Sequence, residues 1–284
     1  MTTSGRGREA LAAYLFLAPA ILGVIGISLT DWTGLKPPAF VGLANFHEIF
    51  TGDLFFPHSV TSTLFFAFFT VIVGTVYSFT VAMLLNQRIA GRGMLRSVFF
   101  LPYVVPVIGA AIVWAWMFES NFGVINYGLN LVGLNKVKWL GDELTATPAL
   151  GIMSVWGFGN FIVIYLAGLQ GIPRTYLEAV DIDGGNAWHK FRHVMLPLLS
   201  PVILFNVLMS IVVNLQVFVP ALSITKGAPN SSTLYMVYYV FRQGFQNNLF
   251  GYASALSLIF FAFIAVVTAV IYVTSRKWMF FEGE

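Results

Sequence analysis

The sequence predicts an all-α integral membrane protein with six transmembrane helices, in one domain over residues 1–284. Three observations support this prediction. Hydrophobic residues make up 58% of the chain and charged residues only 10%, and the mean hydropathy is +0.81, unlike a soluble globular protein. Six apolar runs are each long enough to cross a bilayer. The charged residues gather in the segments between the runs.

The six expected spans are residues 11–30, 60–85, 98–118, 147–169, 198–222 and 251–274. The first run could also be a signal peptide, because Ala18-Pro19-Ala20 supplies small residues, although it is long for a signal-peptide core. Cleavage there would leave five spans. We expect Pro102, Pro106 and Pro220 to kink spans, and Pro197 to limit the helix that precedes the fifth span.

The distribution of basic residues predicts the orientation. The two ends of the chain, residues 86–97 and residues 172–197 hold ten of the fifteen Lys and Arg. By the positive-inside rule these segments face the cytoplasm, so both termini are expected inside.

The chemistry that is missing from the spans excludes several classes of function. None of the expected spans contains Asp, Glu, Lys, Arg or His, which argues against a proton-driven carrier and an intramembrane hydrolase. The net charge of +3 is too small and scattered to indicate nucleic-acid binding, and the absence of cysteine excludes disulfides and thiol catalysis. His189 and His193 have a helical pair spacing but no nearby third ligand, so we do not expect a metal site.

Uncharged polar residues do occur within the spans. Asn206, Ser210 and Asn214 are four residues apart and therefore share one helix face. Trp156 and Asn160 have the same spacing in the fourth run, where glycines at 157 and 159 permit close approach. Two readings stay open: hydrogen bonds between helices, or a path for a neutral, hydroxyl-rich solute such as a sugar.

The polar stretch of residues 172–197 predicts two short helices joined by a tight turn. Thr175 and Glu178 have the spacing of a capping box. Asp183-Gly184-Gly185 suits a sharp bend, and Asn186 can cap the second helix. A polar helical hairpin between two spans indicates a partner outside the membrane.

This stretch resembles the EAA coupling loop of ABC-importer permeases, whose pattern is Glu-Ala-Ala, Asp-Gly-Ala, an aromatic position, Leu-Pro and a second Pro. The matching residues are Glu178, Ala179, Val180, Asp183, Gly184, Gly185, Phe191, Leu196, Pro197 and Pro201. Val180 and Gly185 replace two family alanines, which bears on the packing at the bend. The resemblance implies that coupling to an ATPase involves Glu178, Ala179, Asp183, Gly184, Phe191, Leu196 and Pro197.

The resemblance covers nearly the whole chain and is specific to the carbohydrate-importing branch of these permeases, which also carries glycerol phosphate. The matching segments are residues 14–19, 41–46, 91–93, 100–103, 167–173 and 251–255. Each is a weak signal alone, but their order is a strong one. The turn at 225–230 departs from the family pattern, because Lys226 and Ala228 replace glycines.

The resemblance implies half of a pseudo-symmetric pore in a bacterial or archaeal cell membrane. The implied partners are a second permease, two ATPase subunits and an external solute-binding protein; surrounding lipid is expected, and nucleic acid is not. ATP closes the ATPase pair, the coupling helices move with it, and the pore opens outward. The chain has no Walker-type phosphate loop, so we expect no catalytic residues and no cofactor of its own, with ATP and Mg bound by the ATPase. The alternatives are a permease for phosphate, metal or peptide, or a membrane-embedded enzyme.

Overall fold

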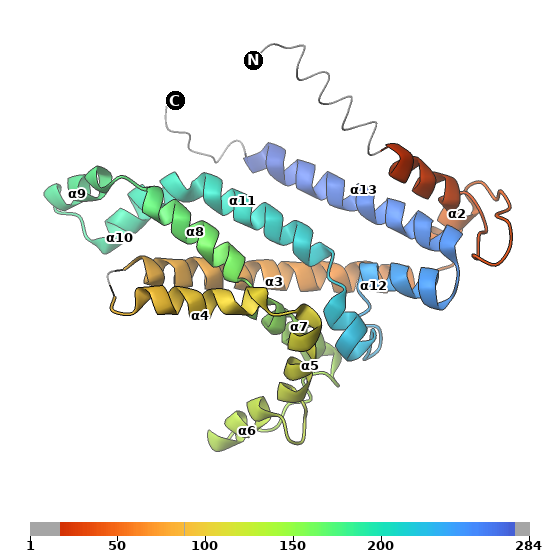
Figure 1. Cartoon of the computed structure of the whole chain (residues 1–284), viewed down its shortest axis with the longest axis horizontal. Helices are drawn as coiled ribbons and strands as arrows, with labels where there is room; N and C mark the ends of the chain where they lie inside the picture. Colours follow the sequence, from red (N-terminus) through yellow and green to blue (C-terminus); the bar gives the residue numbers. More distant parts are fainter. Residues whose placement is uncertain (1–17, 88, 276–284) are drawn as a thin grey trace, which may run out of the picture.

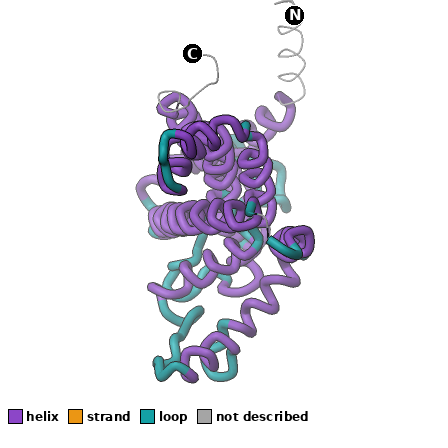
Figure 2. The backbone as a smooth tube through the Cα atoms, turned by 90° about the vertical axis from the view of Figure 1, so that its left-hand side faces the viewer, coloured by secondary structure: helices purple, strands orange, loops and turns teal. Residues whose placement is uncertain are grey.

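The computed structural model describes residues 18–87 and 89–275, and this part of the chain is helical without a strand (Figure 2). A first helix, Ala18–Ser28, precedes the others. The helices that follow are α2 (Ala44–Thr51), α3 (Phe55–Asn86), α4 (Arg92–Val104), α5 (Val107–Met117), α6 (Val124–Leu131), α7 (Glu143–Trp156), α8 (Gly159–Gly171), α9 (Arg174–Ile182), α10 (Ala187–Lys190), α11 (Leu196–Leu215), α12 (Met236–Phe241) and α13 (Phe250–Ser275). Three π-helical segments are η1 (Phe191–Met195), η2 (Ala221–Thr225) and η3 (Arg242–Gln246).

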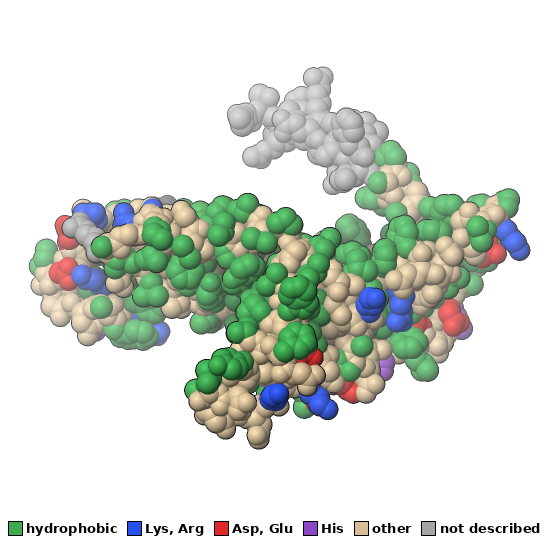
Figure 3. Space-filling model, turned by 60° about the horizontal axis from the view of Figure 1, so that its bottom comes forward, with side chains coloured by type: hydrophobic (Ala, Val, Ile, Leu, Met, Phe, Trp, Pro, Cys, Tyr) green, Lys and Arg blue, Asp and Glu red, His purple; other side chains and the backbone are tan. Residues whose placement is uncertain are grey.

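The helices that run roughly along the long axis of the molecule are α3, α4, α8, α11 and α13 (Figure 1). The pair α9 and α10 lies at one end of this bundle, and α2 lies at the other. Helices α5, α6 and α7 project to one side. Apolar side chains cover the middle of the visible surface, and many of the charged side chains lie toward its ends (Figure 3). This distribution fits a bundle that crosses a bilayer.

The expected third span, residues 98–118, is wrong as a single helix. Helices α4 and α5 meet at an angle of 98°. Val105 is extended because it precedes a proline, and Pro106 occupies the cap position before α5. The break was therefore signalled by Pro106, whereas Pro102 lies inside α4 and is tolerated in its last turn.

The expected fourth span is also broken, with 52° between α7 and α8. The break lies at Gly157 and Phe158. Phe158 is buried, and its ring packs so closely on Gly74 of α3 that a Cβ on residue 74 would overlap it. Gly159 likewise brings α8 onto the backbone of α4, because its Cβ would lie 2.8 Å from the carbonyl oxygen of Phe99. The predicted close approach is thus confirmed at Gly159.

The fifth span is displaced from its expected bounds of 198–222. Helix α11 ends at Leu215, ahead of Pro220, which cannot donate a backbone hydrogen bond and occupies the cap position before η2. At its other end, Pro197 was expected to limit how far the preceding helix runs without a kink; it lies in the first turn of α11, directly after the π-helical turn η1. One helical run of 29 residues, Ala187–Leu215, joins α10, η1 and α11. In η1 the amide of Leu196 donates to the carbonyl of Phe191, five residues back, and this wider turn accommodates the proline.

Three described helices are long and apolar enough to cross a membrane, and five spans result if each bent pair counts as one. The expected first span overlaps the helix Ala18–Ser28, but its residues 11–17 lie outside the described part, so the six-span count stays a prediction. The amide of Asn45 donates to the carbonyls of Ser28 at 2.8 Å and Thr30 at 2.9 Å. Asn45 thereby holds the end of this first helix beside α2.

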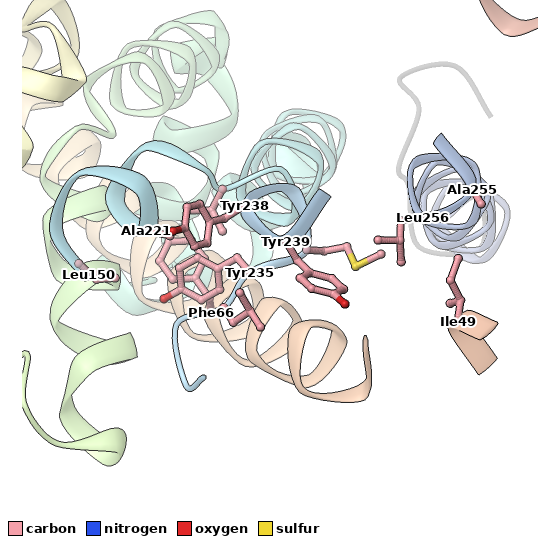
Figure 4. Close-up of a cluster of buried hydrophobic side chains, with 12 residues drawn as sticks. Ile49, Phe66, Leu150, Ala221, Tyr235, Tyr238, Tyr239, Ala255 and Leu256 are labelled. Atoms are coloured by element: carbon pink, nitrogen blue, oxygen red, sulfur yellow. The ribbon is translucent and has the colours of Figure 1, made fainter. Parts of the chain in front are cut away.

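The largest buried cluster lies toward the α2 end of the bundle (Figure 4). Phe66 from α3 packs on Tyr235 with ring centroids 4.9 Å apart. Tyr238 and Tyr239 of α12 and Leu256 of α13 join it. The segment between the expected fifth and sixth spans therefore contains the packed helix α12.

Candidate functional site: an exposed helical hairpin and a buried polar stripe

Helices α9 and α10 form a hairpin that stands clear of the bundle (Figure 1). Neither helix contains a buried residue. Apolar side chains are nevertheless present on it: Tyr176, Ile182 and Trp188 are 45%, 86% and 62% exposed. Bare apolar groups on a small projecting element indicate a surface that binds another protein.

The bend between the two helices is a Schellman motif. The amide of Gly184 donates to Asp181 and the amide of Gly185 donates to Val180, at 3.1 Å and 2.8 Å. Gly184 has a φ of +73°, which glycine adopts without the penalty that a side chain brings. The predicted turn at residues 183–185 is confirmed.

Val180 and Gly185 fill the same space at this bend. A Cβ on residue 185 would overlap Cγ1 of Val180 and lie 2.9 Å from the Val180 carbonyl oxygen. The two departures from the family pattern are therefore linked, because the larger side chain at 180 occupies the volume that alanine at 185 would take.

The caps of the hairpin follow the sequence prediction at one helix only. Asn186 accepts a bond from the His189 amide at 3.1 Å, and His189 Nδ1 accepts one from the Asn186 amide at 3.2 Å. The capping box expected at Thr175 and Glu178 is wrong. The cap position of helix α9 is Pro173, two residues before the expected cap, so Thr175 lies inside the helix.

An ion pair closes the hairpin. The Lys190 ammonium lies 2.6 Å from the Asp181 carboxylate, which joins α10 to α9. At the base, Phe191 contacts Trp188 with ring centroids 5.5 Å apart and Phe79 of α3 with centroids 6.2 Å apart. The hairpin is therefore braced against the bundle, and it continues directly into α11 through η1.

The proposed coupling residues fall into two groups. Glu178, Ala179, Asp183 and Gly184 are exposed on the hairpin. Phe191, Leu196 and Pro197 are half-buried at its base, where the helical run enters the bundle. The first group can meet a partner, and the second can transmit its movement.

The polar stripe of α11 is buried inside the chain. Asn206, Ser210 and Asn214 are only 2%, 2% and 3% exposed. The amide of Asn206 donates to the Phe161 carbonyl of α8 at 3.3 Å, and that of Asn214 donates to the Ser210 carbonyl at 2.8 Å and hydroxyl at 3.1 Å. The shared helix face was predicted correctly. In this structure its side chains bond to α8 and to one another within α11.

Trp156 and Asn160 do not share a face of one helix. The break at Gly157 and Phe158 separates them, because Trp156 ends α7 and Asn160 lies in the first turn of α8. Trp156 is 37% exposed and makes an edge contact with Trp114 of α5, with ring centroids 6.0 Å apart. These two residues remain more accessible than the stripe.

An arginine-lined cavity beside the hairpin was not predicted from the sequence. Arg92 and Arg96 of α4 and Arg174 of α9 line it together with Glu178. The four-residue spacing of Arg92 and Arg96 would have placed them on one helix face. That Arg174 joins them depends on the packing of α9, which no local pattern indicates.

Comparison with known proteins agrees with this architecture. The family described as "Binding-protein-dependent transport system inner membrane component" matches residues 74–279. A probable ABC transporter permease, YesP of Bacillus subtilis, is 33% identical over 98% of this chain and 94% of its own. The trehalose/maltose permease MalF of Thermococcus litoralis is 31% identical over 95% of both chains.

Solved structures show the same fold. A bacterial ABC transporter involved in the import of the acidic polysaccharide alginate superposes with a TM-score of 0.78 at 20% identity, over 95% of this chain and 96% of that one. The expected family is therefore confirmed. The chain belongs to the binding-protein-dependent transport system inner membrane components, the ABC transporter permeases.

Proposed function

We propose that this chain is a transmembrane permease subunit of an ATP-driven importer for a sugar, polyol or oligosaccharide. The observation that carries the proposal is the exposed hairpin of α9 and α10 at one end of an apolar helical bundle, in a chain of the permease family. The sugar class is supported by the names of relatives, among them a trehalose/maltose permease and an arabinooligosaccharide permease that is 29% identical over 96% of this chain.

The hairpin is proposed to dock an ATPase subunit in the cytoplasm. Glu178 lies on its exposed surface, and Tyr176 and Ile182 supply apolar area for the contact. In this proposal the chain takes part in a complex with a second permease, two ATPase subunits and an external binding protein. The ATPase subunits bind ATP and Mg, and this chain contributes the lever and half of the path.

The continuous helix from Ala187 to Leu215 is proposed as the lever. The ion pair between Lys190 and Asp181 and the Schellman bend make the hairpin one body. Because the hairpin continues into α11 without a hinge loop, a displacement at the ATPase moves the helix that bears Asn206, Ser210 and Asn214. This connection links ATP-driven closure to the interior of the bundle.

The substrate path is proposed to involve Trp156 and Asn160, with Asn206, Ser210 and Asn214 reached when α11 moves. An aromatic face and amide groups suit a neutral, hydroxyl-rich solute. Burial of the stripe in this structure supports a packing role in the present state, so solute contact requires that α11 separate from α8. The second permease would supply the facing wall.

Purification and transport test the proposal. The chain should co-purify with a second permease and an ATPase, and the reconstituted complex should hydrolyse ATP faster when binding protein and its sugar are added. A panel of mono-, di- and oligosaccharides on the binding protein identifies the solute. A complex stimulated by phosphate, a metal or a peptide, and by no sugar, would overturn the sugar assignment.

A further inference from the structure

A basic cavity of about 520 Å³ lies where the hairpin joins the bundle. It is enclosed by the end of α3, the start of α4, the end of α8 and the start of α9. Its polar lining consists of Asn86, Arg92, Arg96, Gln170, Arg174 and Glu178. Three guanidinium groups against one carboxylate give the cavity an excess of positive charge.

Arg96 is the least satisfied of these groups. Its Nε and Nη2 atoms are buried and have no hydrogen-bond partner among the described residues. Within those residues the only ion pair joins Lys190 to Asp181, outside the cavity. A buried charge without a partner is strongly unfavourable. Arg96, with Arg92 one helical turn before it, is therefore arranged to receive an anion.

The basic cavity continues into an apolar groove. A second hollow, of about 200 Å³, shares Arg96 and Gln170 with the first and follows α4 and α8 along the bundle. Phe100, Val163 and Ala167 are among its lining residues, and each is exposed. The site thus combines an anion-binding end at the hairpin with an apolar channel on the surface of the bundle.

We propose that this composite site binds an anionic glycerophospholipid. Its phosphate lies among Arg92, Arg96 and Arg174, and an acyl chain lies in the groove between α4 and α8. A free phosphate or a carboxylate of the ATPase satisfies the arginines but leaves the apolar groove uncovered, whereas a phospholipid fills both. Basic pockets between membrane helices on the cytoplasmic side are suited to anionic headgroups.

This proposal rests on the proposed function in one respect only, because the orientation of the chain decides which leaflet of the membrane supplies the lipid. Binding measured in detergent does not depend on orientation or on transport, so failure of the lipid site and failure of the importer assignment are distinguishable.

The test uses the assembled transporter in detergent, delipidated and titrated with phosphatidylglycerol, phosphatidylcholine or glycerol 3-phosphate, with binding measured by native mass spectrometry. We expect phosphatidylglycerol to bind, and we expect Arg96→Gln to weaken its binding about five-fold or more. The reason is that each basic residue near an anionic lipid changes the affinity about five-fold. Arg92→Gln and Arg174→Gln should each weaken binding about five-fold, and they keep the test open if Arg96→Gln fails to assemble. Lys36→Gln, an exposed charge far from the hairpin, is the matched control and should change nothing.

Three outcomes would overturn the proposal. If phosphatidylcholine bound as well as phosphatidylglycerol, the charge of the headgroup would be irrelevant. If glycerol 3-phosphate bound as well, the apolar groove would contribute nothing. Loss of the ATPase subunit from the Arg92 and Arg174 variants, with phosphatidylglycerol binding unchanged, would assign the cavity to a carboxylate of that partner.

Discussion

The side chain of Val180 occupies the space in which a Cβ of residue 185 would lie. Gly184 has a positive φ, but Gly185 does not. Backbone conformation therefore does not require glycine at 185; packing against Val180 does. The two family alanines are replaced together at one contact, and the bend keeps its Schellman hydrogen bonds.

Gly185→Ala is therefore expected to destabilise the hairpin by about 1–3 kcal/mol, the usual cost of overpacking. Val180→Ala combined with Gly185→Ala should recover part of this loss, because it removes the contact with Cγ1 and leaves those with the residue 180 carbonyl oxygen at 2.9 Å and the His189 Cβ at 3.3 Å. Thermal unfolding of the purified complex and protease cleavage at the hairpin measure the effect. Additive losses in the double variant would show that the two positions are independent.

Glu178→Ala is expected to abolish solute-stimulated ATP hydrolysis while the protein still inserts and folds. The carboxylate is exposed on the hairpin, so its removal costs this chain little stability and acts on the partner contact. Hydrolysis with and without solute-loaded binding protein is the measurement. Glu48→Ala, an exposed carboxylate on α2 at the other end of the bundle, is the control. Normal stimulation in Glu178→Ala at normal membrane levels contradicts the coupling assignment.

The topology can be read by cysteine labelling, because the native chain has no cysteine. Ala187 on the hairpin and Leu35 at the opposite end are both exposed. In intact cells a cysteine at 35 should react with an impermeant thiol reagent and a cysteine at 187 should not. Inverted vesicles stripped of the ATPase should reverse the pattern. Reaction at 187 in intact cells would invert the proposed orientation.

Substitutions in the buried polar stripe of α11 distinguish a packing role from a transport role. If Asn206 only ties α11 to α8 and Asn214 only bonds to Ser210 within α11, Asn206→Ala and Asn214→Ala should lower the free energy of unfolding by about 0.6 kcal/mol per bond. Transport of every sugar should then fall by the same factor. If they meet solute when α11 moves, loss of a hydrogen bond costs about 0.5–1.5 kcal/mol. That is about two- to twelve-fold in use of limiting solute, and it should differ between sugars. Transport normalised to assembled complex decides between them.

A hydrogen bond between Tyr239 and Asp53 stabilises the α2 end of the bundle. The Tyr239 hydroxyl donates to the Asp53 carboxylate at 2.6 Å, and the other oxygen of Asp53 accepts the Phe55 and Phe56 amides at the start of α3. Tyr239→Phe should cost about 1.5–3 kcal/mol, as expected for a bond to a charged acceptor. Thermal unfolding measures the loss, and Tyr176→Phe, on the exposed hairpin, is the matched control and should be neutral.

The same contact predicts a dependence on alkaline pH. Burial, and then the neighbouring Asp53, raise the pKa of Tyr239 to about 12 from its ordinary value near 10. Because the folded state holds the proton more tightly than the unfolded state, this stabilisation is complete below about pH 10 and is lost as the pH rises through 12. Between pH 8 and 12 the unfolding temperature should therefore fall more steeply with pH in the native protein than in Tyr239→Phe. Parallel curves would contradict the role given to Tyr239.

The sequence by itself determined what depends on composition and on short-range chemistry. The apolar runs and the clustering of charges indicated a helical membrane protein, and the Asp183-Gly184-Gly185 turn and the Asn186 cap were predicted because they involve neighbouring residues. The shared face of Asn206, Ser210 and Asn214 followed from helical periodicity alone.

Only the tertiary structure decided where those helices break, continue and pack. Phe158 and Gly159 bend the fourth run because they fit against Gly74 of α3 and the backbone of α4, neighbours far away in sequence. The π-helical turn of η1 directly precedes Pro197 in the first turn of α11, and one helical run continues through both, although the proline by itself predicted a limit there. Arg174 meets Arg92 and Arg96 for the same reason: a contact between distant elements depends on how their surfaces pack, and local propensity carries no information about it.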